Sequence, residues 1–120
     1  MLISIVLPAK NESAAIGQTV EKIKHLSIHY EIIVVNDGST DNTKDVAEQA
    51  GAKVVTHTYS KGNGAAIKTG ARTATGDIIV FMDADGQHDP QDIPRLVAKI
   101  EEGYDLVVGA RQKGSQASMG

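Results

Sequence analysis

Short apolar runs recur along the chain, each followed by turn residues and then by a segment with helical spacing. The runs are rich in Val and Ile and do not alternate strictly with polar residues. This is typical of strands that are buried on both faces of a sheet. The pattern therefore predicts five strands, at residues 3–8, 31–36, 52–57, 77–82 and 105–110.

The segments between the runs place apolar residues on one helical face, most clearly at residues 16–23 and 93–100. Glycine stands where three of these helices are expected to stop, at Gly51, Gly76 and Gly103. Strands that alternate with helices predict a parallel sheet with right-handed crossovers. We therefore expect an α/β fold of three layers, a Rossmann-like parallel sheet covered by helices.

Length and composition are those of one compact soluble domain. The 120 residues are 41% hydrophobic and 22% charged, and the net charge of −3 argues against nonspecific binding to nucleic acid. Aromatic residues make up only 3% of the chain, too few for a base-stacking surface. We expect the domain to occupy residues 1–111 and a flexible polar tail to follow at 112–120.

The sequence contains no cysteine, which excludes a disulfide framework and a thiolate metal site and fits a reducing cytosol. The first apolar run has no basic leader and is too short to span a bilayer, so neither a signal peptide nor a transmembrane helix is expected. We therefore expect a cytoplasmic protein, either free or peripheral at the cytoplasmic face of a membrane.

Polar residues follow four of the predicted strands, at the end where parallel α/β sheets bind ligands. They lie at residues 9–12, 36–39 and 83–88 and at Arg111. The carboxyl ends of parallel strands meet at one edge of the sheet. These residues are therefore expected to form a single site there.

Asp83 and Asp85 lie two positions apart at a strand end, so both carboxylates can lean the same way. At ~5 Å and an effective dielectric of ~20 they repel by roughly 3 kcal/mol, which a bound cation would relieve. Such oxygen ligands suit Mg²⁺ or Mn²⁺, with Gln87 and His88 as candidate further ligands. The alternative is a simple turn in which Asp83 caps a backbone amide, but a turn does not account for the second acid. Asp89, before a proline, is expected to cap the next helix.

Asp37 follows a buried strand and precedes a glycine. It is a candidate acceptor for a nucleobase or ribose, the role of acids in the strand-to-helix turns of nucleotide-binding sheets. The alternative is an Asx-turn at this position. Asp41, four residues later, is expected to cap the following helix.

The glycine-rich stretch from Lys61 to Gly70 fails both common phosphate-binding patterns. A P-loop needs glycine before its Lys-Thr, where Ile67 stands instead, and this position also lacks the third glycine of a dinucleotide motif. Lys61 and the amides of the stretch, such as that of Gly64, remain candidates to meet a diphosphate. Close packing of a helix on the sheet accounts for the glycines equally well.

Glu12 and Arg111 are weak signals on their own. Glu12 is expected in the first turn of a helix, where the helix dipole favours a carboxylate in any case. Arg111 is placed at the ligand edge, where it would neutralise phosphate or pair with Asp83.

Together these motifs resemble a known family. The segments "SIVLPAKNE", "EIIVVNDGSTDNT", "KGNGAAIKTGARTATGDIIVFMDADGQHDP" and "DLVVGARQKG" are similar to those of family 2 glycosyltransferases of the GT-A fold. The nearest likeness is to the polyprenyl-phosphate sugar transferases. The resemblance covers residues 3 to about 113, in order, and the four motifs together are far more specific than the DXD-like Asp83–Asp85 alone.

The resemblance implies an inverting, metal-dependent enzyme that moves a sugar from a UDP- or GDP-sugar to an acceptor such as a polyprenyl phosphate. It implies the cofactor Mg²⁺ or Mn²⁺, held by Asp85 and Gln87. The nucleotide-binding residues would be Pro8, Ala9, Glu12, Asp37, Lys61, Gly64, Asp83 and Ala84. The catalytic residues would be Asp83, Asp85 and Arg111. Asn36 departs from the family, since many relatives carry a second aspartate there, and the change bears on base selectivity.

The resemblance also implies that this chain is a truncated, donor-binding half, since relatives are much longer and their acceptor site and any general base lie in the part that follows. A lipid-phosphate acceptor is already ionised and would need no base. The family places a later antiparallel strand between the fourth and the fifth. Without it, strand five must either pair directly with strand four or leave a sheet edge exposed, and an exposed edge would favour a homodimer.

A nucleotide-sugar-binding or regulatory α/β module without catalysis is the alternative function. A phosphoacceptor receiver domain fits poorly, because the acids and the lysine that it needs after strands one, three and five are missing. A nucleotidyltransferase would carry a glycine-rich basic loop after strand one, and residues 8–12 contain no glycine.

Overall fold

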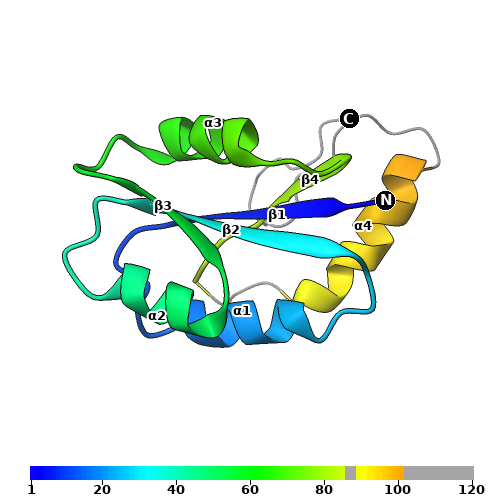
Figure 1. The fold of residues 1–120 in the computed structure, drawn as a ribbon, viewed down its shortest axis with the longest axis horizontal. Coiled ribbons are helices and arrows are strands. Elements are labelled where there is room, and N and C mark those ends of the chain that lie inside the picture. Colours follow the sequence, from blue (N-terminus) through cyan, green and yellow to red (C-terminus); the bar gives the residue numbers. More distant parts are fainter. Residues whose placement is uncertain (86–88, 102–120) are drawn as a thin grey trace.

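The computed structural model describes residues 1–85 and 89–101 of the chain. Strands and helices alternate along this part (Figure 1). The strands are β1 (Ile3–Ala9), β2 (Tyr30–Asp37), β3 (Lys53–His57) and β4 (Ile78–Phe81). The helices are α1 (Ile16–Lys24), α2 (Thr43–Ala50), α3 (Asn63–Thr73) and α4 (Ile93–Glu101), with a short 3₁₀ turn, η1 (Pro90–Asp92), before α4.

The strands form a parallel sheet in the order β3-β2-β1-β4. Helix α3 covers one face, whereas α1, α2 and α4 lie on the other (Figure 1). The predicted three-layer α/β architecture is therefore confirmed, and the four predicted strands in the described part appear within one residue of their expected bounds. The strand predicted at 105–110 and the glycine at 103 lie outside the described residues.

Strand β1 is central and is buried on both of its faces. Ile5 and Leu7 pack into the core shared with α1, α2 and α4, while Val6 packs with Ile33 and Ala66 beneath α3. All of these side chains are fully buried. A strand covered on both sides must be apolar at consecutive positions, so the non-alternating run in the sequence follows from its place in the sheet.

The strand order reverses direction at β1. The chain moves outward through β2 to β3 and then returns to the opposite side of β1 to form β4. At such a switch point the connections after the two neighbouring strands leave toward opposite faces and open a crevice at their carboxyl ends. The fold therefore places a crevice between the segments that follow β1 and β4.

Helix ends follow the sequence signals in part. Gly51 ends α2 in the left-handed conformation, with φ 106°, as predicted. Asp89 caps the turn η1 by accepting the amide of Gln91 at 2.9 Å, also as predicted. The expectation for Gly76 was wrong, because α3 ends at Thr73. Gly76 is required for another reason, since a Cβ there would lie 2.5 Å from Ser4 Oγ.

The described residues contain no helix that combines the length and the apolar character needed to cross a bilayer.

The glycines of the 61–70 stretch have different surroundings. A Cβ at Gly70 would lie 2.3 Å from Cγ1 of Val6, whereas a Cβ at Gly64 would meet nothing within 4 Å. Close packing of α3 on the sheet therefore explains Gly70 but does not explain Gly64.

Glu31 ties the opposite, amino-terminal edge of the sheet together. Its carboxylate accepts the Ser4 hydroxyl and also the amide and hydroxyl of Thr75, at 2.7 and 3.0 Å. Burial by itself would raise the pKa of Glu31, but these hydrogen bonds outweigh it and hold the pKa below its ordinary value of 4.5. The charged form of Glu31 therefore stabilises the fold.

We predict opposite effects for two alanine substitutions in α3. Gly70→Ala should lower the free energy of unfolding by about 1–3 kcal/mol, because the added methyl overlaps Val6. Gly64→Ala, the matched control, should raise it by about 0.4–1 kcal/mol, because the methyl is accommodated and the unfolded chain loses freedom. Urea unfolding of both variants measures this. Equal stabilities would show that α3 does not need its close approach.

We predict that Glu31→Gln flattens the acid limb of the stability curve. Since the folded-state pKa is depressed, the unfolded chain binds the extra proton first, and the stabilisation is present above 4.5 and lost as pH falls below it. Urea midpoints recorded from neutral pH down through 4.5 should fall less steeply in the variant. An unchanged slope would contradict a role for the charged carboxylate.

Candidate functional site

A pocket of about 410 Å³ opens at the carboxyl edge of the sheet, at the β1/β4 switch point. This volume is within the range of small-molecule sites. Its walls come from the end of β1 and the segment after it, the end of β2, the segment that leads into α3, the start of α3 and the segment after β4. The lining residues are Pro8, Ala9, Lys10, Glu12, Asp37, Ser60, Gly62, Asn63, Ala66, Asp83, Ala84 and Asp85.

One wall of the pocket is acidic. Glu12 is contributed by the segment after β1, and Asp83 and Asp85 follow β4. Burial raises the pKa of Glu12, and the nearby charges of Asp85, Asp41 and Asp83 raise it further. The neighbouring carboxylates therefore disfavour the ionised form of Glu12, and a cation in the pocket would stabilise that form.

The described residues offer only part of a metal site. No group of three His, Asp or Glu side chains in this part of the chain is arranged to hold an ion. Mg²⁺, however, commonly takes one or two protein carboxylates and completes its shell with water and substrate phosphate. The pair Asp83 and Asp85 fits that pattern, and Gln87, the other predicted ligand, lies outside the described residues together with His88.

Asn11 joins the segment after β1 to the one after β2. It is the only non-glycine residue with positive φ, 55°, in the described part of the chain. Its side-chain oxygen accepts the backbone amides of Thr40 and Asp41 at 2.8 and 3.3 Å, and its backbone amide donates to Ser39 Oγ at 2.9 Å. These contacts fix the backbone that carries Pro8, Ala9 and Glu12.

Asp41 strengthens the same connection. Its carboxylate accepts the amide of Thr43 at 3.0 Å, the Thr43 hydroxyl, and the amide of Ser13 at 3.2 Å. These bonds, led by that of the Thr43 hydroxyl, lower the pKa of Asp41 to about 2. The predicted helix cap was wrong by one position, since Asn42 is the N-cap residue of α2. Asp41 nevertheless accepts the backbone amide of Thr43, the first residue of α2.

Glu12 also differs from its prediction. Helix α1 begins at Ile16 and has no acid in its first turn, so Glu12 lies in the turn before the helix. Its carbonyl accepts the amides of Ala15 and Ile16 at 3.0 and 2.8 Å, and its amide donates to Thr43 Oγ1 at 2.9 Å. The helix dipole therefore does not account for this acid.

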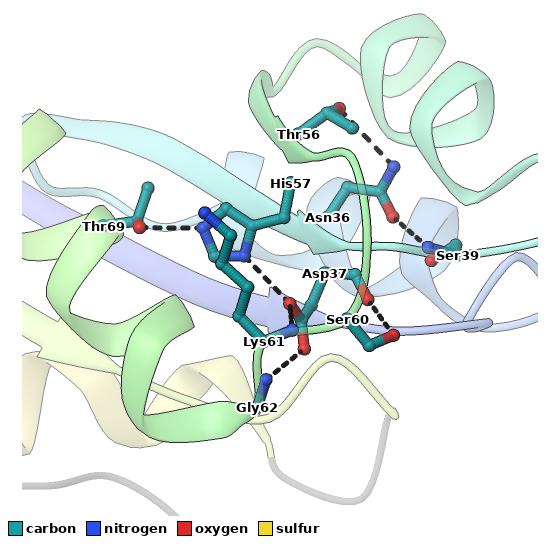
Figure 2. A network of polar contacts seen from close by, with 9 residues as sticks. All are labelled: Asn36, Asp37, Ser39, Thr56, His57, Ser60, Lys61, Gly62 and Thr69. Carbon is teal, nitrogen blue, oxygen red and sulfur yellow. Dashed lines mark hydrogen bonds and ion pairs between the residues drawn. The ribbon is translucent and has the colours of Figure 1, made fainter.

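Asp37 lines the pocket from the end of β2 and is 6% exposed. Figure 2 shows the polar contacts around it. Its carboxylate accepts the amides of Lys61 and Gly62 at 2.8 and 3.0 Å and contacts Nδ1 of His57 at 2.9 Å. Burial alone would raise the pKa of Asp37, but these bonds lower it, so the buried group is ionised. The alternative of an Asx-turn at Asp37 is not observed; Asn36 accepts the Ser39 amide instead, at 3.3 Å.

Seven residues predicted for the site lie together on the pocket wall: Pro8, Ala9, Glu12, Asp37, Asp83, Ala84 and Asp85. Lys61 and Gly64 do not line it. The Lys61 ammonium lies 5.2 Å from the Tyr59 ring centroid, and the backbone of Lys61 is what supports the site. Arg111 lies outside the described residues.

Sequence reasoning missed several lining residues, among them Ser60, Asn63 and Ala66. Ser60 directly precedes the glycine-rich stretch and the other two lie within it, so the stretch itself was the only available signal. It also missed His57, the last residue of the strand predicted at 52–57. No local pattern marks a histidine that pairs with an acid twenty positions earlier.

The chain is similar to transferases that act on lipid phosphates. It is 40% identical over 128 residues to an undecaprenyl-phosphate 4-deoxy-4-formamido-L-arabinose transferase of Proteus mirabilis, covering 97% of this chain and 38% of that protein. It is 36% identical over 117 residues to a dolichol-phosphate mannosyltransferase of Pyrococcus furiosus, covering 92% of this chain and 33% of that one. The chain thus spans well under half the length of these relatives.

A solved structure has the same fold. Glucosyl-3-phosphoglycerate synthase of Mycobacterium tuberculosis, in complex with Mn²⁺, UDP and phosphoglyceric acid, superposes with a TM-score of 0.77 at 35% identity, over 88% of this chain and 40% of that one. The four-stranded parallel sheet is therefore GT-A-like. Residues 4–119 match the model of glycosyl transferase family 2, and the chain belongs to that family.

Proposed function

We propose that this chain carries the donor-binding part of an inverting, metal-dependent glycosyltransferase that uses a UDP- or GDP-sugar. The observation that carries the proposal is the pocket at the β1/β4 switch point, with the buried acceptor Asp37 on one wall and the acids Asp83 and Asp85 on another. A nucleoside diphosphate has a base that donates N–H groups at one end and anionic phosphates at the other. The two walls match these two ends.

The base end would lie against Asp37, Pro8 and Ala9. Asp37 is ionised and buried, so it can accept an N–H from a base in a site where little water competes. Pro8 and Ala9 supply apolar surface from the end of β1. This arrangement would hold the base through one directed hydrogen bond and through packing.

The diphosphate end would lie at the acidic wall. Asp83 and Asp85 would hold Mg²⁺ or Mn²⁺, with Gln87 as a proposed further ligand. The ion, when bound, neutralises the charge that develops on the departing nucleoside diphosphate. Asn63 and Gly64 begin α3, whose first turn contains no acid, so its amides suit a phosphate oxygen. Arg111 is proposed to act on the same phosphates.

The acceptor is proposed to be a polyprenyl phosphate, because the named relatives are undecaprenyl-phosphate and dolichol-phosphate transferases. A lipid phosphate is already ionised at neutral pH and attacks the anomeric carbon without help from a base. This proposal agrees with the described pocket, where the acids are suited to a metal ion. It also implies work at the cytoplasmic face of a membrane.

We predict metal-dependent nucleotide binding that requires Asp85. In calorimetric titrations with UDP and with GDP, each with and without Mn²⁺, one nucleotide should bind in the presence of the ion. Asp85→Ala should weaken that binding by ~10-fold or more, because a charged ligand to the ion is lost.

The matched control is Asp92→Ala, which also removes one carboxylate. Asp92 lies in η1, does not line the pocket, and pairs with Arg95 at 3.4 Å on the exposed surface, so it should leave nucleotide affinity unchanged. Binding that is insensitive to both Mn²⁺ and Asp85→Ala would contradict the metal site. Absence of binding by either nucleotide would contradict the proposed function itself.

A further inference from the structure

A series of side-chain contacts runs from α3 to Asp37 through His57 (Figure 2). His57 ends β3 and is 8% exposed. Its Nδ1 lies 2.9 Å from Oδ1 of Asp37, and its Nε2 lies 2.8 Å from Oγ1 of Thr69. Neither His57 nor Thr69 lines the pocket, so any effect of His57 on a ligand must pass through Asp37.

The chemistry of the partners fixes the ring proton. An ionised carboxylate only accepts, so Nδ1 of His57 carries a proton and donates it to Asp37. Nε2 meets the Thr69 hydroxyl, which can either donate to this nitrogen or accept from it. Both ring nitrogens of the buried imidazole therefore have a partner.

The connectivity Asp37–His57–Thr69 is that of an acid, a base and a hydroxyl nucleophile, but it cannot act as one. Thr69 Oγ1 is directed at the buried imidazole and lies outside the pocket lining. A nucleophile must reach the substrate, and this hydroxyl does not. These contacts therefore serve to support the carboxylate of Asp37.

Counting acceptor positions shows what the support leaves open. A carboxylate offers about four lone-pair positions. In Asp37, three of these positions are occupied by N–H donors: Nδ1 of His57, the Lys61 amide and the Gly62 amide. About one position remains, on a side chain that lines the pocket.

His57 is the donor that best fixes which position stays open. The two amides belong to the segment between β3 and α3, whereas His57 is held in the sheet by β3 and at its far nitrogen by α3. Without His57, one amide would remain on each oxygen, that of Lys61 on Oδ1 and that of Gly62 on Oδ2. Because the terminal torsion of an aspartate has a broad energy minimum, the carboxylate would then be fixed less tightly. Oδ1 would also lose one of its two partners.

We propose that His57 is a positioning residue for the donor nucleobase, which fixes the carboxylate of Asp37 so that its one open acceptor position faces the base. The inference rests on the proposed nucleotide site. It assigns to His57 no contact with substrate and no proton transfer.

Two conservative variants separate the two nitrogens of the ring. In His57→Asn the side-chain amide nitrogen lies near the place of Nδ1 and can still donate to Asp37. In His57→Gln it lies near the place of Nε2, so it can meet Thr69 but not Asp37. Thr69→Val is the control for the far contact, because it removes the hydroxyl and preserves the shape.

The measurement is calorimetric titration with Mn²⁺ and UDP or GDP, whichever the wild-type chain binds more tightly. His57→Gln should weaken binding ~10-fold or more, the effect of a hydrogen bond misdirected in a buried site, whereas His57→Asn should stay within ~3-fold of wild type. Thermal melting of each variant distinguishes a loss of affinity from a loss of folding. If His57 had only a structural role, His57→Asn and His57→Gln would both melt at lower temperatures and would bind the nucleotide with equal affinity.

Equal affinities for His57→Asn and His57→Gln, with the wild type binding normally, would overturn the positioning role and leave the proposed function standing. Failure of the wild type to bind either nucleotide would remove the proposed function instead. If both variants unfold, nitrogen-edited NMR of the wild type decides. The proton on Nδ1 of His57 should shift when the nucleotide is added, and an unchanged signal would overturn the proposal.

Discussion

The rest of the site depends on the buried negative charge of Asp37. An ionised carboxylate removed from water is tolerated only when N–H donors replace its hydration. The donors come from β3, through His57, and from the backbone that leads into α3, at Lys61 and Gly62. Satisfying one charge therefore fixes how β2, β3 and α3 meet. Gly38 belongs to the same requirement, because a Cβ there would lie 2.4 Å from the Ser60 amide and would prevent the approach.

The two walls of the pocket treat their carboxylates in opposite ways. The structure supplies donors to Asp37 and lowers its pKa, whereas at the acidic wall burial and neighbouring acids raise the pKa of Glu12. A ligand with one end that donates hydrogen bonds and another that brings a cation fits this asymmetry, and a metal-bound nucleoside diphosphate has both. Hydrogen-bond donors thus stabilise the charge of Asp37, whereas the charge of Glu12 would be stabilised only by a cation brought to the pocket.

Much of this could be predicted from the sequence, and the missing part has a common cause. The four strands of the described part and seven residues of the pocket wall were predicted because burial on two faces and the position after a strand are local properties of the chain. The start of α1 was not predicted, because a turn before Ile16 decides it. The role of Gly76 was not predicted either, because a packing contact with Ser4 decides it. The bridge that Asn11 makes and the role of His57 were missed for the same reason, since each residue meets partners at least twelve positions away.

The two walls also differ in the sequence separation between the residues that form them. Asp37 is completed by donors that lie within 25 positions, from segments on the β2–β3 side of the sheet. The acidic wall joins Glu12 to Asp83 and Asp85, and they meet only because the strand order returns β4 to the side of β1. Geometry at Asp37 is thus set by hydrogen bonds to particular atoms, while geometry at the acidic wall is set by sheet order. Changes in side chains near Asp37 should therefore alter ligand recognition more sharply than equal changes in the packing beneath the acids, where the parallel pairing of β1 and β4 keeps the carboxylates together.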